Sequence, residues 1–247
     1  MIIGIIPARG GSVGIPRKNL RPVGEISLVN RAVLFGLDVC DLVAVTSDDE
    51  EIIATAVSTG AIGVKRPVEI STGTASSESA IAHALEFLTE ETKLKKLFNS
   101  EPNPVVGFIQ ATSPFQERDA FTSGAALIQE LGPEFSTFSA VEDYSFLWEQ
   151  LPNETWSPRN HNKSHRTMRQ DLSPTVKETG GFYQFRMQTF LKSGSRFSEQ
   201  VVPLLVDPRY AIDIDTEQDL QWADFLAPTA DPNLSFLTNK KEEKNAN

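Results

Sequence analysis

The stretch MIIGIIPARGGSVGIPRKN, residues 1–19, decides the fold of this 247-residue chain. It begins with an apolar run and breaks at once into a loop rich in glycine and basic side chains. A short buried strand followed by such a loop is how α/β proteins hold phosphates, because glycines let backbone N–H groups approach an anion closely. A surface turn with solvated charges is the alternative. Residues 1–24 hold four basic side chains and no Asp or Glu, in a chain of net charge -10, which favours an anionic small molecule.

Composition narrows the class of protein. The length suits one large α/β domain or two small ones. A pI of about 4.9 argues against nucleic acid or an anionic membrane as partner, since both need broad basic surfaces. The single cysteine, Cys40, excludes an intrachain disulfide and fits a reducing cytosol. No signal peptide and no membrane-length apolar run is evident, so we expect a cytoplasmic protein.

Short apolar runs alternate with amphipathic segments along most of the chain. The runs are expected to be strands buried on both faces of a parallel sheet, and they are Ile2–Ile6, Leu42–Thr46, Val105–Gln110, Thr137–Val141, Gly181–Phe185, Val201–Val206 and Ala211–Ile214. Helices are expected at Leu28–Leu37 (with Ser27 as N-cap), Glu50–Val57, Ser76–Leu88, Arg118–Leu131 and Glu217–Leu226. The alternation predicts a doubly wound α/β sheet, whose ligands bind at the carboxyl ends of strands.

Two segments depart from this alternation. Residues at about 142–175 are rich in Trp, Pro, Asn and Arg and show little periodicity. A long irregular insertion in a compact domain is usually functional or makes a subunit contact. Residues 228–247 are polar and are expected to form a disordered tail. The sequence therefore predicts one domain over residues 1–227, with the insertion projecting from it.

Asp213 and Asp215 lie in the last expected strand, where residues two apart face the same side. Paired carboxylates there suit Mg²⁺ bound together with phosphates. The alternative is that the second carboxylate and its acidic neighbours only cap the next helix. From the residues alone both interpretations stay open.

Three further polar motifs have a structural and a functional interpretation. Residues 110–115, QATSPF, follow a strand and suit recognition of a sugar or base, or form a plain turn with a Ser/Thr cap. Residues 166–171, RTMRQD, suit an anionic substrate or a neighbouring subunit, or form a solvated loop. Residues 47–50, SDDE, are expected to start a helix, because acidic side chains favour the first helical turn.

These motifs resemble those of the CMP-sialic acid synthetases, or acylneuraminate cytidylyltransferases. The similarity begins in the basic loop, with IPARGGS at residues 6–12 and GIPRKN at residues 14–19, and extends to about residue 226. Further matching motifs follow in the family's order, at Thr46–Glu50, Arg66-Pro67, Gln110–Pro114, Arg169–Asp171, Gly180–Tyr183 and Ile212–Asp215.

The resemblance implies a fold and an activity. The fold is a Rossmann-like, GT-A-like nucleotidyltransferase domain with a mixed, mostly parallel sheet. The insertion at about 142–175 would be a protruding dimerisation arm, through which one subunit completes its partner's site in a homodimer. The activity would be that of a cytidylyltransferase that joins CTP to a nonulosonic (sialic-type) 2-keto acid sugar with Mg²⁺ as cofactor. Pyrophosphate would be the second product.

The resemblance also implies site residues. The nucleotide would be bound by Ala8, Arg9, Gly10, Gly11, Ser12, Lys18, Asn19 and Arg66. The sugar would be bound by Gln110, Thr112, Ser113, Arg166, Arg169, Gln170 and Tyr183. Asp213 and Asp215 would hold Mg²⁺, and with Arg9 and Lys18 they would form the catalytic set.

The chain departs from the family's pattern at two positions. Val13 stands where the family usually has Lys, and Ala111 stands where it tends to have Pro. The first change removes a phosphate-binding cation, for which Arg17 is the candidate replacement. The alternatives are therefore a cytidylyltransferase for another sugar, such as an octulosonate or a sugar phosphate, or a non-catalytic nucleotide-binding relative.

Overall fold

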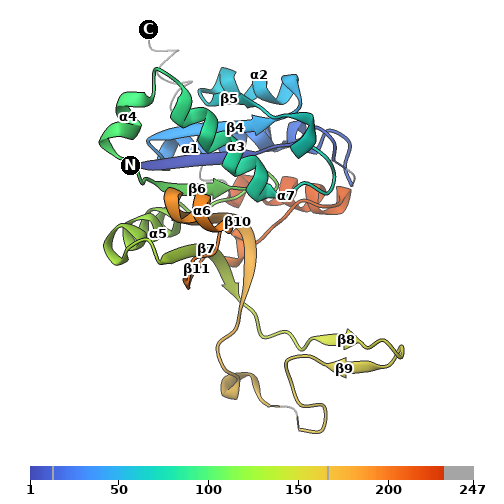
Figure 1. Ribbon diagram of the computed structural model, residues 1–247. Helices are drawn as coiled ribbons and strands as arrows, with labels where there is room; N and C mark the ends of the chain where they lie inside the picture. The colour runs from blue at the N-terminus through green and yellow to red at the C-terminus, as the bar shows by residue number, and fades with distance from the viewer. Residues whose placement is uncertain (13, 166, 231–247) are drawn as a thin grey trace.

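The computed structural model describes residues 1–12, 14–165 and 167–230, and its centre is a seven-stranded sheet (Figure 1). The strand order is β11-β7-β10-β6-β1-β4-β5. The strands are β1 (Ile2–Pro7), β4 (Leu42–Ser47), β5 (Ile62–Lys65), β6 (Val105–Ile109), β7 (Phe135–Glu142), β10 (Val176–Arg186) and β11 (Gln200–Leu205). Only β10 runs antiparallel to its neighbours in this sheet. The predicted mixed, mostly parallel sheet is confirmed.

Helices cover both faces of the sheet, as the doubly wound prediction requires. One buried apolar cluster joins the sheet to α1 (Leu28–Val39), α2 (Glu50–Thr59) and α5 (Arg118–Leu131). The cluster on the other face joins it to α3 (Ser77–Glu90), α4 (Lys95–Ser100) and α6 (Met187–Ser193). A third cluster packs α7 (Glu217–Ala230) on Ile15, Phe115 and Ile214. The last contact brings the residues before α7 to the basic loop after β1.

The helix N-termini follow the residues that the sequence marks as caps. The Ser27 hydroxyl accepts the Asn30 N–H, which confirms the predicted cap of α1. The Asp49 carboxylate accepts the N–H of Glu51 at 2.8 Å and starts α2, as expected for the acidic run at 47–50. The Ser76 hydroxyl caps α3. Each cap satisfies a backbone donor that the first helical turn leaves unpaired.

Two expectations about the elements are wrong, and the structure also contains strand β5 and helices α4 and α6, which the sequence analysis does not predict. Residues 211–214 form no strand: they follow a 3₁₀ turn, η4 (Pro208–Tyr210), and join the rest of the fold through the hydrogen bond from Ile214 N to Thr112 O. Strand β5 was not expected, because its four residues carry no run of large apolar side chains. Helix α7 continues through Pro228 to Ala230, so residues 228–230 are helical. The expectation of disorder for 231–247 lies outside the described residues.

The predicted insertion leaves the body of the molecule. Strand β7 ends at Glu142 and β10 begins at Val176, and the chain between them projects from the sheet (Figure 1). We call residues 143–175 the arm. It contains the hairpin of β8 (Trp148–Gln150) and β9 (Trp156–Pro158) and a 3₁₀ turn, η3 (Arg169–Asp171). Two shorter strands, β2 (Pro22–Val23) and β3 (Ile26–Ser27), and two 3₁₀ turns, η1 (Lys18–Leu20) and η2 (Val68–Ile70), complete the described structure. None of the described helices combines the length and apolarity of a membrane span.

Candidate active site

A cleft of about 380 Å³ opens at the carboxyl ends of β1, β5 and β6. It lies at the edge where parallel α/β sheets bind their ligands. Its lining contains Arg9, Ser12, Lys18, Asn19, Arg66, Gln110, Thr112 and Asp215 from the predicted set, together with Pro7, Gly73, Ala75, Ser76, Ser77, Phe108 and Ala111. Residues far apart in the sequence, such as Arg9 and Asp215, which are 206 positions apart, are thus brought together.

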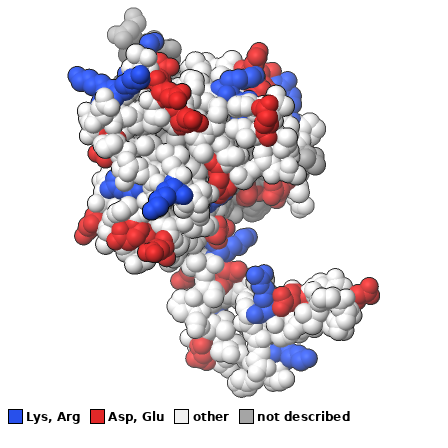
Figure 2. All heavy atoms as spheres, in the orientation of Figure 1, with Lys and Arg blue, Asp and Glu red and all other residues white. Residues whose placement is uncertain are grey.

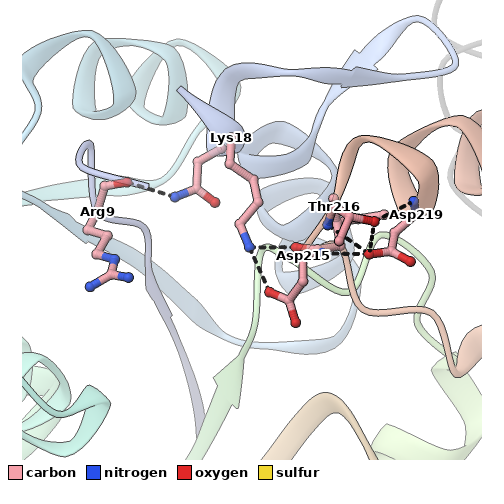
Figure 3. A network of polar contacts seen from close by, with 7 residues as sticks. Arg9, Lys18, Asp215, Thr216 and Asp219 are labelled. Atoms are coloured by element: carbon pink, nitrogen blue, oxygen red, sulfur yellow. Dashed lines mark hydrogen bonds and ion pairs between the residues drawn. The ribbon is translucent and has the colours of Figure 1, made fainter. Parts of the chain in front are cut away.

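Lys18 is anchored at one side of the cleft, as Figure 3 shows. Its ammonium group donates to the Ile214 carbonyl and lies 3.1 Å from Asp215 Oδ1. Asp219 Oδ2 in turn accepts the Asp215 N–H at 3.1 Å and the Thr216 hydroxyl at 2.8 Å. The Thr216 hydrogen bonds lower the pKa of Asp219 and keep this carboxylate ionised. The start of α7 therefore fixes the backbone that carries Asp215.

Two hydrogen bonds fix the backbone of the basic loop after β1. Gly10 N–H donates to Asp48 Oδ1 at 2.9 Å, and the Asn19 side-chain amide donates to the Arg9 carbonyl at 2.9 Å. A Cβ on Gly14 would lie 2.5 Å from the Asp215 carbonyl oxygen, so only glycine permits this close approach. The guanidinium of Arg9 reaches toward the other side, with Nη1 3.4 Å from the Gly73 carbonyl. In Figure 3 it points away from the Lys18–Asp215 pair.

Asn19 and Arg66 are buried polar groups in the wall of the cleft. Asn19 Oδ1 has no hydrogen-bond partner among the described residues. A buried acceptor without a partner is costly, so this oxygen suits a donor from a ligand. Arg66 Nη2 donates to the Thr46 carbonyl at 2.6 Å. Burial lowers the pKa of the Arg66 guanidinium and the Asp48 carboxylate opposes that lowering.

The charges in the lining suit a polyanion. Among the described residues, the lining combines three cationic side chains, Arg9, Lys18 and Arg66, with a single carboxylate, Asp215. The cleft is therefore locally positive in a chain of net charge -10. Arginine and lysine with oriented backbone N–H groups are the groups that proteins use to bind phosphate.

The predicted sugar-binding residues fall into three places: the cleft, the strand β10 behind its wall, and the arm. Gln110 and Thr112 line the cleft, and the buried Ser113 follows them. Tyr183 lies behind the cleft wall: its hydroxyl donates to Glu178 at 2.8 Å and its ring stacks on Phe108. Burial and the Glu178 contact raise the pKa of this hydroxyl.

Arg169 and Gln170 lie on the arm, away from the cleft of the same chain (Figure 1). The Arg169 guanidinium lies 4.4 Å from the centre of the Tyr144 ring, and the Gln170 amide contacts the Met168 sulfur. Arg166 lies outside the described residues. The roles assigned to this group stay predictions.

Arg17 does not join the cleft lining given by the described residues. It has a left-handed backbone, with φ 56°, and its guanidinium forms an ion pair with Glu51 on α2. Val13, the position that prompted the comparison with Arg17, lies outside the described residues. In the part of the chain that the structure describes, the cationic side chains in the cleft lining are those of Arg9, Lys18 and Arg66.

The two expected metal ligands are exposed carboxylates on one extended segment. Asp215 lines the cleft, and Asp213 Oδ2 would lie 3.6 Å from a Cβ on Gly180. The described residues contain no group of three or more His, Cys, Asp or Glu side chains that could hold a metal alone. Mg²⁺ bound with nucleotides needs only one or two carboxylates, since phosphates and water supply the remaining ligands. The donor set therefore fits Mg²⁺ held jointly with a phosphate substrate.

Some residues that shape the site escaped the sequence analysis. Asp48 was assigned with its neighbours to a helix start, yet its carboxylate supports the basic loop. Asp219 orients Asp215, and Gly73 to Ser77 form a wall of the cleft. The position of Asp48 directly after an expected strand could have indicated that its carboxylate lies at the ligand-binding edge of the sheet. The wall at 73–77 had no local signal, because its position depends on how α3 packs on the sheet.

The sheet and its covering helices define an α/β protein of the nucleotidyltransferase fold. A family model described as cytidylyltransferase matches residues 3–204, and the chain belongs to this family. The N-acylneuraminate cytidylyltransferase A of Danio rerio is 31% identical over 226 residues, which are 90% of this chain and 49% of that protein. A pseudaminic acid cytidylyltransferase of Campylobacter jejuni is 29% identical over 227 residues, 90% of this chain and 94% of the relative. The chain spans about half the length of the Danio rerio relatives it matches.

Solved structures agree on the fold. A CMP:2-keto-3-deoxy-manno-octonic acid synthetase complexed with CTP superimposes with a TM-score of 0.62 at 12% identity, over 92% of this chain and 98% of the other. A 4-diphosphocytidyl-2C-methyl-D-erythritol synthase from Anaerococcus prevotii gives a TM-score of 0.62 at 14% identity, with the same coverage. At these identities the likeness establishes the architecture alone.

Proposed function

We propose that this protein transfers CMP from CTP to a sialic-type nonulosonic acid and releases pyrophosphate. The observation that carries the proposal is the meeting of Arg9, Lys18 and Arg66 with Asp215 in one cleft at the carboxyl edge of the sheet. Membership of the cytidylyltransferase family and similarity to relatives named for neuraminic and pseudaminic acids support the choice of nucleotide and of sugar class.

In the proposed reaction the anomeric hydroxyl of the sugar attacks the α-phosphorus of CTP. A new P–O bond forms, the bond to the pyrophosphate oxygen breaks, and the hydroxyl proton is released. Arg9 and Lys18 neutralise the charge that develops on the leaving pyrophosphate, and Asn19 Oδ1 accepts a donor of the nucleotide. The protein's contribution is therefore mainly positioning and charge stabilisation.

Asp213 and Asp215 would hold Mg²⁺. The ion, when bound, supplies Lewis-acid activation of the α-phosphate. Lys18 limits the freedom of Asp215 by pairing with one of its oxygens at 3.1 Å. Gln110 and Thr112, on the neighbouring wall, would orient the sugar beside this segment.

The arm belongs to the same proposal as an interface with a second copy of the chain. Its side chains Trp148 and Trp156 are 48% and 61% exposed, which is costly for tryptophan on a free surface. On the face seen in Figure 2 most of the arm consists of uncharged residues. Arg169 and Gln170, which the arm holds away from its own cleft, would then act in the cleft of the partner.

The test is a pyrophosphate-release assay of four NTPs against a panel of 2-keto acid sugars with Mg²⁺. We expect release only with CTP and only when a nonulosonic acid is present. Release with an octulosonate or a sugar phosphate instead would favour another sugar specificity. Thermal stabilisation by CTP without release for any sugar would make the protein a nucleotide-binding relative and refute the proposal.

A further inference from the structure

Strand β10 is interrupted by a bulge next to the cleft. Against β7, Glu178 pairs with Ala140 and Tyr183 pairs with Phe138, so β10 advances five residues where β7 advances two. The residues of the bulge are Thr179, Gly180, Gly181 and Phe182. Ser139 is the residue of β7 that faces them. Bulges of this kind re-aim strands beside functional sites.

Two buried hydroxyl groups accept backbone N–H groups of the bulge, which regular strand pairing with β7 does not satisfy. Ser139 Oγ and Thr179 Oγ1 are 2.6 Å apart, and both residues are buried. Ser139 Oγ accepts the Phe182 N–H at 3.0 Å, and Thr179 Oγ1 accepts the Gly181 N–H at 3.2 Å. The pair therefore satisfies two backbone donors that would otherwise be buried without partners.

A second set of hydrogen bonds ties the bulge to the loop after β6. The Gln116 side-chain amide donates to the Ser113 carbonyl at 2.9 Å and to the Gly181 carbonyl at 3.1 Å. Gln110 N–H donates to the same Gly181 carbonyl at 3.1 Å. The position of the bulge thus depends on both neighbouring strands, and the cleft residue Gln110 is part of the linkage.

The bulge places Gly180 against polar side chains from two other segments, the loop after β6 and the segment before α7. Gly180 has φ +74°, and a Cβ on it would lie 3.0 Å from Gln110 Nε2, 3.4 Å from Ser113 Oγ and 3.6 Å from Asp213 Oδ2. The buried Ser113 Oγ has no hydrogen-bond partner among the described residues. A side chain at position 180 would crowd the Gln110 amide, so glycine leaves this cleft group free to bind a sugar hydroxyl.

We propose that Ser139 and Thr179 are positioning residues for the sugar substrate: they lock the bulge, which anchors the Gln110 backbone through Gly181 and leaves the Gln110 amide free to bind a sugar hydroxyl. The inference rests on the proposed function and adds to it the element that sets sugar affinity. Neither hydroxyl lines the cleft, so both act through the backbone of the bulge.

The test compares Thr179→Val, which keeps the volume and removes the hydroxyl, with Thr179→Ser, which restores it. Thr137→Val is the matched control, because Thr137 Oγ1 makes a buried β7–β10 contact with Gln184 outside the bulge. We expect Thr179→Val to raise KM for the sugar about ten- to a hundredfold, with unchanged CTP affinity, since small displacements near a reacting group have effects of this size. Thr179→Ser should restore the sugar KM, and Thr137→Val should lower only the melting temperature.

Two further measurements keep the outcomes distinct. Amide exchange at Gly181 and Phe182 should accelerate in Thr179→Val, and Gly180→Ala should raise the sugar KM even where the first variant folds poorly. Faster exchange with an unchanged sugar KM, or equal losses for CTP and sugar, would overturn the inference while leaving the proposed function intact. Failure of the wild-type protein to release pyrophosphate with any sugar would overturn both.

Discussion

Arg9 and Lys18 are both cations of one loop, yet the structure gives them different surroundings. Lys18 is bound to the Asp215 segment before any ligand arrives, whereas the Arg9 side chain extends to the opposite wall near Gly73. A cation that is already paired contributes mainly position, and one aimed into an open cleft contributes charge where a phosphate arrives. The sequence alone predicted both residues as equal members of one basic loop, because side-chain partners 64 to 197 positions away are not visible in it.

Arg9→Ala should therefore lower kcat about a hundredfold or more, the size of effect found when a donor to developing negative charge is removed. Steady-state pyrophosphate release measures this. Arg118→Ala, on the surface of α5 with its partner Asp38, is the control and should retain wild-type turnover. Near-normal turnover of CTP by the Arg9 variant would remove this side chain from the mechanism.

Asp215→Asn should abolish Mg²⁺-dependent turnover, because the amide loses the charged oxygen that would hold the ion beside the phosphates. The measurement is pyrophosphate release across a MgCl₂ titration. Asp224→Asn is a matched change on α7, since the Asp224 carboxylate accepts the Gly24 N–H at 2.7 Å and is not in the cleft lining, and it should behave as wild type. Survival of both activity and metal dependence in the Asp215 variant would contradict the metal assignment.

At the scale of elements, the sequence predicted what depends on local pattern. Strand β1 and its loop, the cap Ser27 and the bounds of α5 follow from apolar runs and a capping residue close in sequence. Residues 211–214 alternate in burial like a strand, yet they have no neighbouring strand to pair with. Alternation shows which side chains are buried, but only the tertiary arrangement decides whether a ladder forms. The short edge strand β5 does have a neighbouring strand, β4, but its four residues carry no run of large apolar side chains that would predict it.

The contact between the basic loop and this extended segment gives an element-scale prediction. Gly14→Ala would bring Cβ against the Asp215 carbonyl, where the unshifted distance is 2.5 Å, so the loop and the segment must separate. We expect CTP affinity to fall about tenfold or more, because the phosphate-binding groups of the two elements would no longer converge. Isothermal titration with CTP measures the loss, and a melting curve separates it from unfolding. Unchanged affinity would show that the two elements bind the nucleotide independently.

At the scale of the molecule, the sequence predicts where the arm lies along the chain. It does not predict what the arm contacts. The sequence predicts an irregular insertion at about residues 142–175, and in the structure β7 ends at Glu142 and β10 begins at Val176. Its hairpin exposes tryptophan instead of burying it, so its packing partner must be sought outside its own chain. The sequence of one chain does not show which surface of a partner covers these side chains.

An arm that pairs two copies predicts a solution dimer sensitive to Trp156. Trp156→Asp should shift the protein toward monomer, because a buried unpaired charge in an interface is costly. Sedimentation equilibrium measures the shift. Trp156→Phe, which keeps an aromatic side chain at the same position, is the control and should leave the oligomeric state unchanged. A monomeric wild-type protein at the same concentration would refute the arm as an interface.

If the arm also completes the partner's cleft, two inactive variants should restore each other. Arg169→Ala removes the arm's contribution and Asp215→Asn disables the cleft, so each protein alone should have little activity. A mixed dimer contains one cleft with an intact Asp215 facing an intact Arg169 on the other subunit. Co-expression should therefore recover about a quarter of the wild-type sites, as random pairing of two subunit types gives. If Arg169 acts in the cleft of its own chain, no pairing assembles an intact site, and the co-expressed protein should stay as inactive as its parents.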